Sequence, residues 1–79
     1  MNPGKDFNSA YRLIAKYAVR RENDIMSGHK DSAGYWGTKM DGVATTLLAL
    51  TGEWCKAVVC VNGSVVVFHG DYQITLTGF

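Results

Sequence analysis

The residues that could carry out nucleophilic chemistry in this 79-residue chain are two cysteines, Cys55 and Cys60, and two histidines, His29 and His69. A thiol nucleophile needs a histidine beside it in space. Cys55 and His69 lie in the same β-rich region, but the strand register derived below places them on opposite faces of a sheet. We therefore expect His69 to form a cross-strand pair with Tyr72, not a catalytic pair with a cysteine.

The spacings typical of other catalytic or cofactor sites are missing. Cys55 and Cys60 form neither a disulfide framework nor zinc-binding knuckles, so we expect buried or half-buried thiols. The segment SGHKDSAGYWG, residues 27–37, is rich in glycine but lacks the spacings that cradle phosphates. The acidic residues do not pair on one element, which disfavours a two-carboxylate hydrolase. We expect no enzymatic activity and no cofactor or metal.

Basic residues are concentrated near the N-terminus. Residues 1–21 hold five basic residues and one acidic residue, whereas residues 22–79 hold three basic and six acidic residues. Arg12, Lys16 and Arg20 are spaced four residues apart, which places them in one stripe on a helix. Such a stripe is compatible with a solvated helix face, with phosphate contacts to a nucleic acid, or with an acidic protein partner.

Apolar periodicity predicts two helices, over residues 6–24 and 38–51. Phe7, Tyr11, Ile14 and Ala18 recur on one side of the first segment. In the second, Thr38 and Asp41 resemble a capping box and Gly52 suits the C-terminal stop.

The segment between these helices, residues 27–37, is predicted to be a loop, because its glycines and serines break the apolar periodicity. The loop carries the aromatic pair Tyr35 and Trp36. We expect this pair either to cover the end of the helix core or to anchor a binding partner.

The last third of the chain reads as three strands, over residues 55–61, 64–69 and 72–77. Asn62-Gly63 is a strong signal for a two-residue hairpin turn, and Gly70-Asp71 is a second candidate. With two such turns, Val59, Val66 and Phe68 lie on the face opposite the core. Two helices cover only one face of such a sheet, so we expect this apolar face to be open.

These elements predict a single small α+β domain over residues 1–79, with two N-terminal helices packed on one face of a three-stranded antiparallel β-meander (ααβββ). The pattern leaves open whether the third strand pairs with the second or with the first. The chain shows neither the apolar segment of a secretory signal nor a run of about 18 apolar residues. We therefore expect a cytoplasmic location.

The expected function is that of a small non-enzymatic binding protein that docks on a larger protein or nucleoprotein complex and modulates or inhibits it. A phage-type inhibitor of host defence, similar in kind to an anti-CRISPR protein, would suit this size. The alternative is a small nucleic-acid-binding regulator that uses the basic first helix. A homodimer through the open sheet face would use the same apolar surface. The expected partner-binding residues are Arg12, Lys16, Arg20, Tyr35, Trp36, Val59, Val66 and Phe68.

Overall fold

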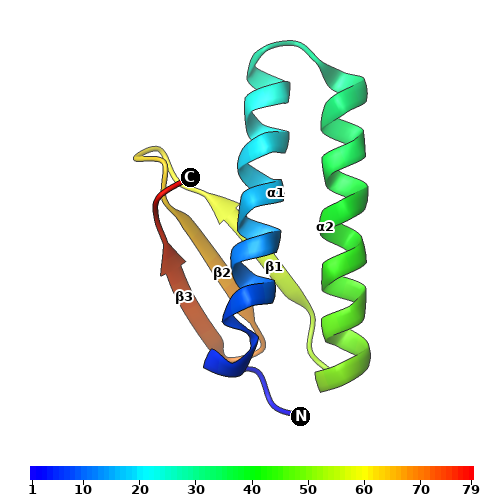
Figure 1. Ribbon diagram of the computed structural model, residues 1–79, viewed down its shortest axis with the longest axis vertical. Helices are drawn as coiled ribbons and strands as arrows, with labels where there is room; N and C mark the ends of the chain where they lie inside the picture. Colours follow the sequence, from blue (N-terminus) through cyan, green and yellow to red (C-terminus); the bar gives the residue numbers. More distant parts are fainter.

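The computed structural model, which describes all of residues 1–79, consists of two antiparallel helices followed by a three-stranded antiparallel sheet (Figure 1). A 3-10 turn, Lys5–Phe7, leads into α1, Asn8–Met26, and α2 spans Lys30–Thr51. The strands are β1, Cys55–Val59, β2, Val65–His69, and β3, Tyr72–Leu76. The strand order is β1-β2-β3. The predicted ααβββ fold is therefore confirmed, and β3 pairs with β2.

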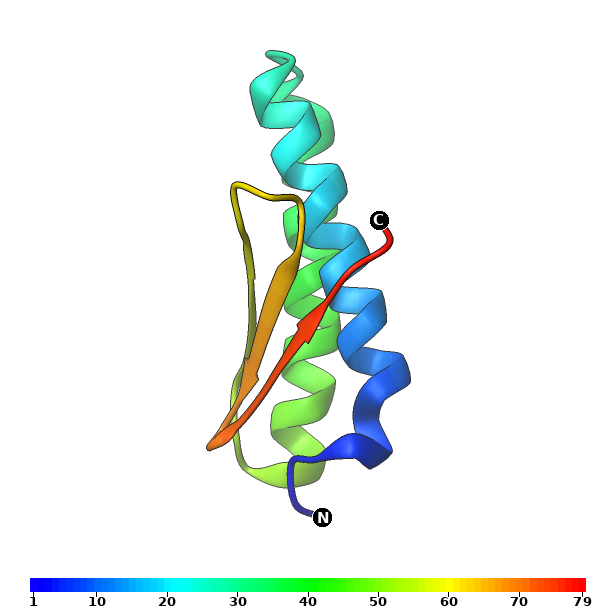
Figure 2. The same ribbon diagram turned by 90° about the vertical axis from the view of Figure 1, so that its left-hand side faces the viewer.

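Both helices lie on the same side of the sheet (Figure 2). The core forms where α1 and α2 meet this side of the sheet. From Tyr11 onward α1 buries the residues on one side, which recur every third or fourth position. Alternate residues of the strands point toward the helices. The buried cluster consists of Tyr11, Ile14, Ala15, Ala44, Leu47, Cys55, Val65, Val67 and Leu76. Neither α1 nor α2 combines the length with the apolar composition that a membrane-spanning helix requires.

The second helix begins eight residues earlier than expected, so the prediction of a loop over residues 27–37 is wrong. The connection between the helices is only Ser27–His29. The amide of Gly28 bonds to the Ile25 carbonyl and that of His29 to the Asp24 carbonyl, which ends α1 in a Schellman motif. Thr38, expected to begin a helix, instead donates its hydroxyl proton to the Gly34 carbonyl inside α2.

The first hairpin also differs from the prediction, because its turn has three residues, not two. The amide of Gly63 bonds to the Cys60 carbonyl, and Cys60 pairs with Ser64 through a backbone hydrogen bond of 2.8 Å. Gly63 has a φ of +86°, whereas Asn62 stays at negative φ and accepts hydrogen bonds from Ser64 through its side chain. This is the pattern of a type I turn followed by a left-handed residue.

The extra turn residue shifts β1 by one position against β2. Val59 therefore pairs with Val65 and packs against the core, and Val58 takes the place on the open face that was predicted for Val59. The second turn, Gly70-Asp71, does have two residues, and the β2–β3 register, with His69 opposite Tyr72, agrees with the prediction.

The helix pair is longer than the sheet that it covers. In Figures 1 and 2 the ends of α1 and α2 that flank residues 27–29 extend beyond the sheet. The molecule is accordingly elongated, with principal extents of 38, 24 and 16 Å. The projecting half of the helix pair must be held together by contacts between the two helices.

Candidate protein-binding surface

Trp36 is the centre of a cluster that joins the projecting parts of α1 and α2. Its ring stacks on Tyr17, with centroids 5.8 Å apart, and meets the ring of Tyr35 nearly at right angles at 5.0 Å. The guanidinium of Arg20 lies 5.1 Å from the centroid of the Trp36 ring. The indole nitrogen donates a hydrogen bond of 3.0 Å to the carboxylate of Asp24. Three kinds of interaction thus fix the position of this side chain.

Lys39 extends this cluster along α2. Its ammonium group lies 5.0 Å from the ring centroid of Tyr35 and 5.8 Å from that of Tyr17. Tyr35 nevertheless remains 56% exposed. The sequence predicted a basic stripe on one element and an aromatic pair on another, and the antiparallel helix pair brings Arg20 into contact with the aromatic residues.

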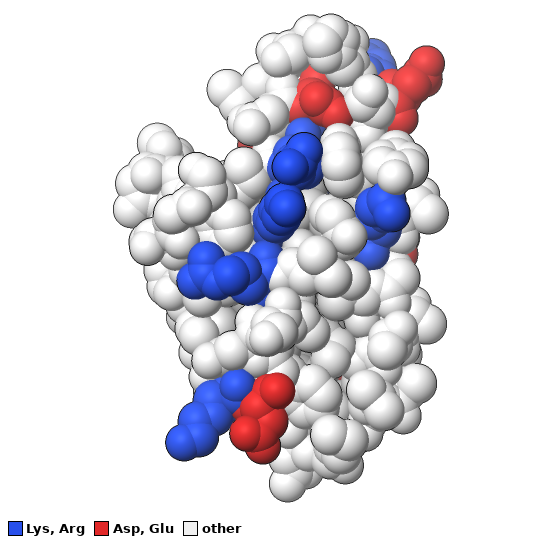
Figure 3. Space-filling view, in the orientation of Figure 1, with Lys and Arg blue, Asp and Glu red and all other residues white.

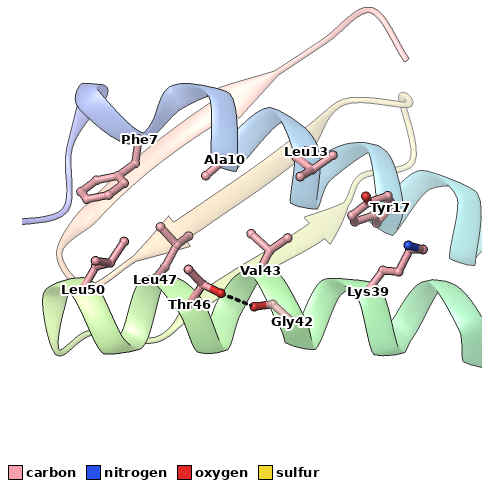
Figure 4. Close-up of a pocket in the computed structure, with 10 residues that line it drawn as sticks. All are labelled: Phe7, Ala10, Leu13, Tyr17, Lys39, Gly42, Val43, Thr46, Leu47 and Leu50. Atoms are coloured by element: carbon pink, nitrogen blue, oxygen red, sulfur yellow. Dashed lines mark hydrogen bonds between the residues drawn. The ribbon is translucent and has the colours of Figure 1, made fainter.

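Next to this cluster an apolar groove of about 480 Å³ runs between α1 and α2 (Figure 4). Leu13 on α1 and Leu50 on α2 line it and are 41% and 47% exposed. Lys39 is the only charged residue of its lining, which consists of Phe7, Ala10, Leu13, Tyr17, Lys39, Gly42, Val43, Thr46, Leu47 and Leu50. We call the groove, together with Lys16, Arg20, Tyr35 and Trp36, the helix-pair face.

The helix-pair face is basic. In Figure 3 the Lys and Arg atoms form a band over the middle of α1, with a further basic group over α2, and most of the visible Asp and Glu atoms lie beyond the two ends of this band. The three residues of the stripe differ in their contacts. Arg12 contacts the C-terminal residues of the chain, because its guanidinium donates a hydrogen bond to the Thr77 carbonyl and lies over the Phe79 ring. Lys16 is exposed, between Arg12 and Arg20 in the stripe.

The second predicted surface is the outer face of the sheet. Val66 and Phe68 lie there as expected, and Val58, 43% exposed, stands beside Val66 in the ladder. Lys56 lies opposite Phe68 with its ammonium 6.0 Å from the ring centroid, and Gln73 flanks Phe68 on β3. The apolar part of this face is therefore small and bordered by polar side chains.

The expectation that Cys55 and His69 lie on opposite faces is wrong, because the shifted register makes them direct cross-strand partners on the helix side. Both are buried. Burial raises the pKa of the Cys55 thiol to about 11, which keeps it protonated. A nucleophilic cysteine needs a lowered pKa, because the thiolate is the reactive form.

His69 is instead part of a buried hydrogen-bond network that sequence reasoning missed. Its Nδ1 lies 2.7 Å from the Tyr11 hydroxyl, and its Nε2 lies 2.8 Å from the Thr51 hydroxyl and 3.0 Å from the Glu53 carbonyl. His69 and Tyr72 are cross-strand partners as expected, but their rings do not stack. The His69 ring makes edge contacts with Phe7 and Tyr11, and the Tyr72 ring stacks on Tyr11.

The Tyr11 hydroxyl itself accepts a hydrogen bond from the Gly4 amide. Its pKa is raised, chiefly by burial. The alternation of His69 with Val65 and Val67 was a signal that this imidazole is buried, but its partners come from distant parts of the chain. No group of three or more His, Cys, Asp or Glu side chains is positioned to hold a metal ion.

Comparisons with protein-family models, with curated proteins and with solved structures found no match to this chain.

Proposed function

We propose that this protein is a non-enzymatic docking protein that binds a larger protein through its helix-pair face and modulates that protein's action. One observation carries the proposal: α1 and α2 place Arg20, Lys39 and the ring of Trp36 in one cluster at the edge of an exposed apolar groove. Aromatic and arginine side chains beside apolar surface are the residues that contribute most to protein-protein binding.

The sizes of the two candidate surfaces favour the helix pair. A helix of 22 residues such as α2 is about 33 Å long, and two packed helices together are about 20 Å wide. The outer sheet face, with three strands of five residues, measures only about 17 by 14 Å. A stable protein-protein interface covers about 800 Å² on each partner. The whole outer side of the helix pair, of which the helix-pair face is a part, approaches this area, whereas the sheet face provides about a third of it.

A nucleic acid is the competing partner, because Arg12, Lys16 and Arg20 form a stripe on α1. Phosphate contacts require cations that are free to reach the backbone of the nucleic acid. Arg12 is engaged with the Thr77 carbonyl and the Phe79 ring, which leaves only Lys16 and Arg20 of the stripe to contact phosphates. The groove beside them is apolar and would gain nothing from phosphates. These contacts support a protein partner.

Site-specific photo-crosslinking in the native host tests the proposal. A photoreactive phenylalanine analogue replaces Tyr35 on the helix-pair face, and in a matched protein it replaces Gln73 on the outer sheet face. We expect a crosslink to one distinct larger protein from position 35 and none from position 73. A crosslink to nucleic acid at position 35 would support the alternative, and no crosslink at position 35 would contradict docking through this face.

A further inference from the structure

The groove of the helix-pair face has the shape of a site for a third helix. It runs from Phe7, at the end of the 3-10 turn, to Tyr17 on α1, a length of about 15 Å or nearly three helical turns. An amphipathic helix that lies in such a groove inserts apolar side chains at positions i, i+3 or i+4, and i+7. The exposed side chains of Leu13 and Leu50 would then lie in a layer of three helices.

Gly42 opens the middle of this groove. It is an exposed residue in the interior of α2, where glycine weakens a helix. A Cβ atom at this position would meet nothing within 4 Å, so no contact inside the protein requires the glycine. Without a side chain at this position, the backbone of α2 is uncovered in the groove wall. The Thr46 hydroxyl donates a hydrogen bond to the Gly42 carbonyl there (Figure 4). Another backbone could approach closely there.

The charges around the groove determine which helix fits. Lys39 lies in the lining, which contains no acidic residue, and Lys16 and Arg20 belong to the stripe beside it. The Asp24 carboxylate near this stripe is already bonded to the Trp36 indole nitrogen. A two-fold dimer through this face would enclose the cations of both copies, and neither groove lining contains an acidic residue to offset them. A partner helix with acidic residues along its flanks would complement them.

We propose that the groove between α1 and α2 binds an acidic amphipathic helix of the partner protein. This inference rests on the proposed docking function and specifies its partner. The carboxylates of the bound helix would lie near Lys16, Arg20 and Lys39, and its apolar side chains would cover Leu13, Val43 and Leu50.

The test uses a synthetic 18-residue helical peptide with leucine at positions i, i+4 and i+7 and glutamate and glutamine elsewhere. Fluorescence anisotropy of the labelled peptide measures its binding to the full chain. One control peptide carries lysine in place of glutamate, and another has the acidic composition in scrambled order. We expect the acidic amphipathic peptide to bind at least about tenfold more tightly than either control, and its affinity to fall as salt is raised.

Two variants of the protein locate the binding. Gly42→Leu fills the groove, whereas Gly34→Leu makes the same change at another exposed position of α2 that also has nothing within 4 Å of its Cβ. Both add a good helix former, so both should keep the helical circular dichroism signal. We expect Gly42→Leu to weaken peptide binding about tenfold or more and Gly34→Leu to leave it unchanged. Equal binding by the two variants, or by the acidic and lysine peptides, would overturn the inference.

This result is separable from that of the crosslinking experiment. If position 35 crosslinks to a partner protein but the chain does not prefer the acidic peptide, the docking function stands and the acidic helix is excluded. Failure of both experiments would remove both.

Discussion

The hydrogen-bond partners of the buried His69 ring define its tautomer. The Glu53 carbonyl near Nε2 can only accept a hydrogen bond, and the Thr51 hydroxyl donates its single proton to the Leu47 carbonyl. Nε2 therefore carries the ring proton, and Nδ1 accepts from the Tyr11 hydroxyl. In this arrangement every buried side-chain polar atom of the network has a hydrogen-bond partner. It ties the N-terminal segment and α1 to the end of α2 and to β2.

The thiol opposite this ring gives stability a specific dependence on pH. The pKa of Cys55 is about 11 in the folded protein and has an ordinary value of 9.0, because burial disfavours the thiolate. At pH 8 and below the thiol is mostly protonated in both states, so its contribution to stability is nearly complete. As the pH rises from 9 to 11 the unfolded chain loses this proton first, so the free energy of unfolding falls by about 2 kcal/mol. Urea unfolding at pH 8 and at pH 11 measures this loss.

The control for this prediction is Cys55→Ala, which removes the thiol. Tyr11 also has a raised pKa and adds to the alkaline loss in both proteins. The variant should therefore lose less stability between the two pH values than the natural chain. Equal losses would show that Cys55 does not contribute.

The helices and strands were predictable from the sequence to different degrees. Apolar periodicity identifies α1 and the second half of α2 because local spacing records which side is buried. The first turns of α2 were hidden by Gly34 and Gly37, which favour a loop in local terms. Contacts with α1 override that preference: Ala33 is buried, Trp36 binds Tyr17, and the Arg21 side chain packs near Gly37.

The register of the first hairpin could not be taken from the Asn62-Gly63 pair alone. The same two residues serve a two-residue turn, in which both have positive φ, and a three-residue turn, in which only glycine does. The Asn62 side chain favours the second by accepting hydrogen bonds from the amide and hydroxyl of Ser64. This choice exchanges Val58 and Val59 between the two faces of the sheet.

Two glycines make opposite contributions to the stability of their elements. A methyl group at Gly63 or at Gly42 would meet nothing within 4 Å, so the two positions differ in backbone conformation and not in packing space. Gly63→Ala should lower the free energy of unfolding by about 1 to 2 kcal/mol, because its φ of +86° is unfavourable for alanine. Gly42→Ala should raise it by about 1 kcal/mol, because alanine favours a helix interior. Urea denaturation measures both, and a change of the same sign in the two variants would contradict this account.

At the scale of the whole molecule, the candidate surface depends on how the helices pack against each other. The sequence identified Arg12, Lys16, Arg20, Tyr35 and Trp36 as separate features of a helix and a loop. Their combination required Trp36 to be helical and α1 to run antiparallel to α2, so that Arg20 and Tyr17 meet its ring. The groove was not predictable from the sequence. Its walls belong to the apolar sides of α1 and α2, and the apolar pattern of each helix does not show which part of that side stays uncovered when the two helices pack.

The predicted homodimer through the outer sheet face can be judged by its size. The face measures about 17 by 14 Å, and only Val58, Val66 and Phe68 form its apolar centre. An interface of this area corresponds to weak, transient association. Any dimer through this face should therefore dissociate on dilution, with a dissociation constant of about 10 µM or weaker. Light scattering over a range of protein concentrations measures it.

The substitutions Val66→Asp and Phe68→Asp together should abolish such a dimer, because they place like charges at the centre of a two-fold interface. Gly42→Leu, which alters only the groove, should leave it intact. A dimer that persists on dilution and survives the aspartate substitutions would have to use another surface. A monomer at every concentration would exclude self-association through the sheet and leave its outer face, like the helix-pair face, free for a different protein.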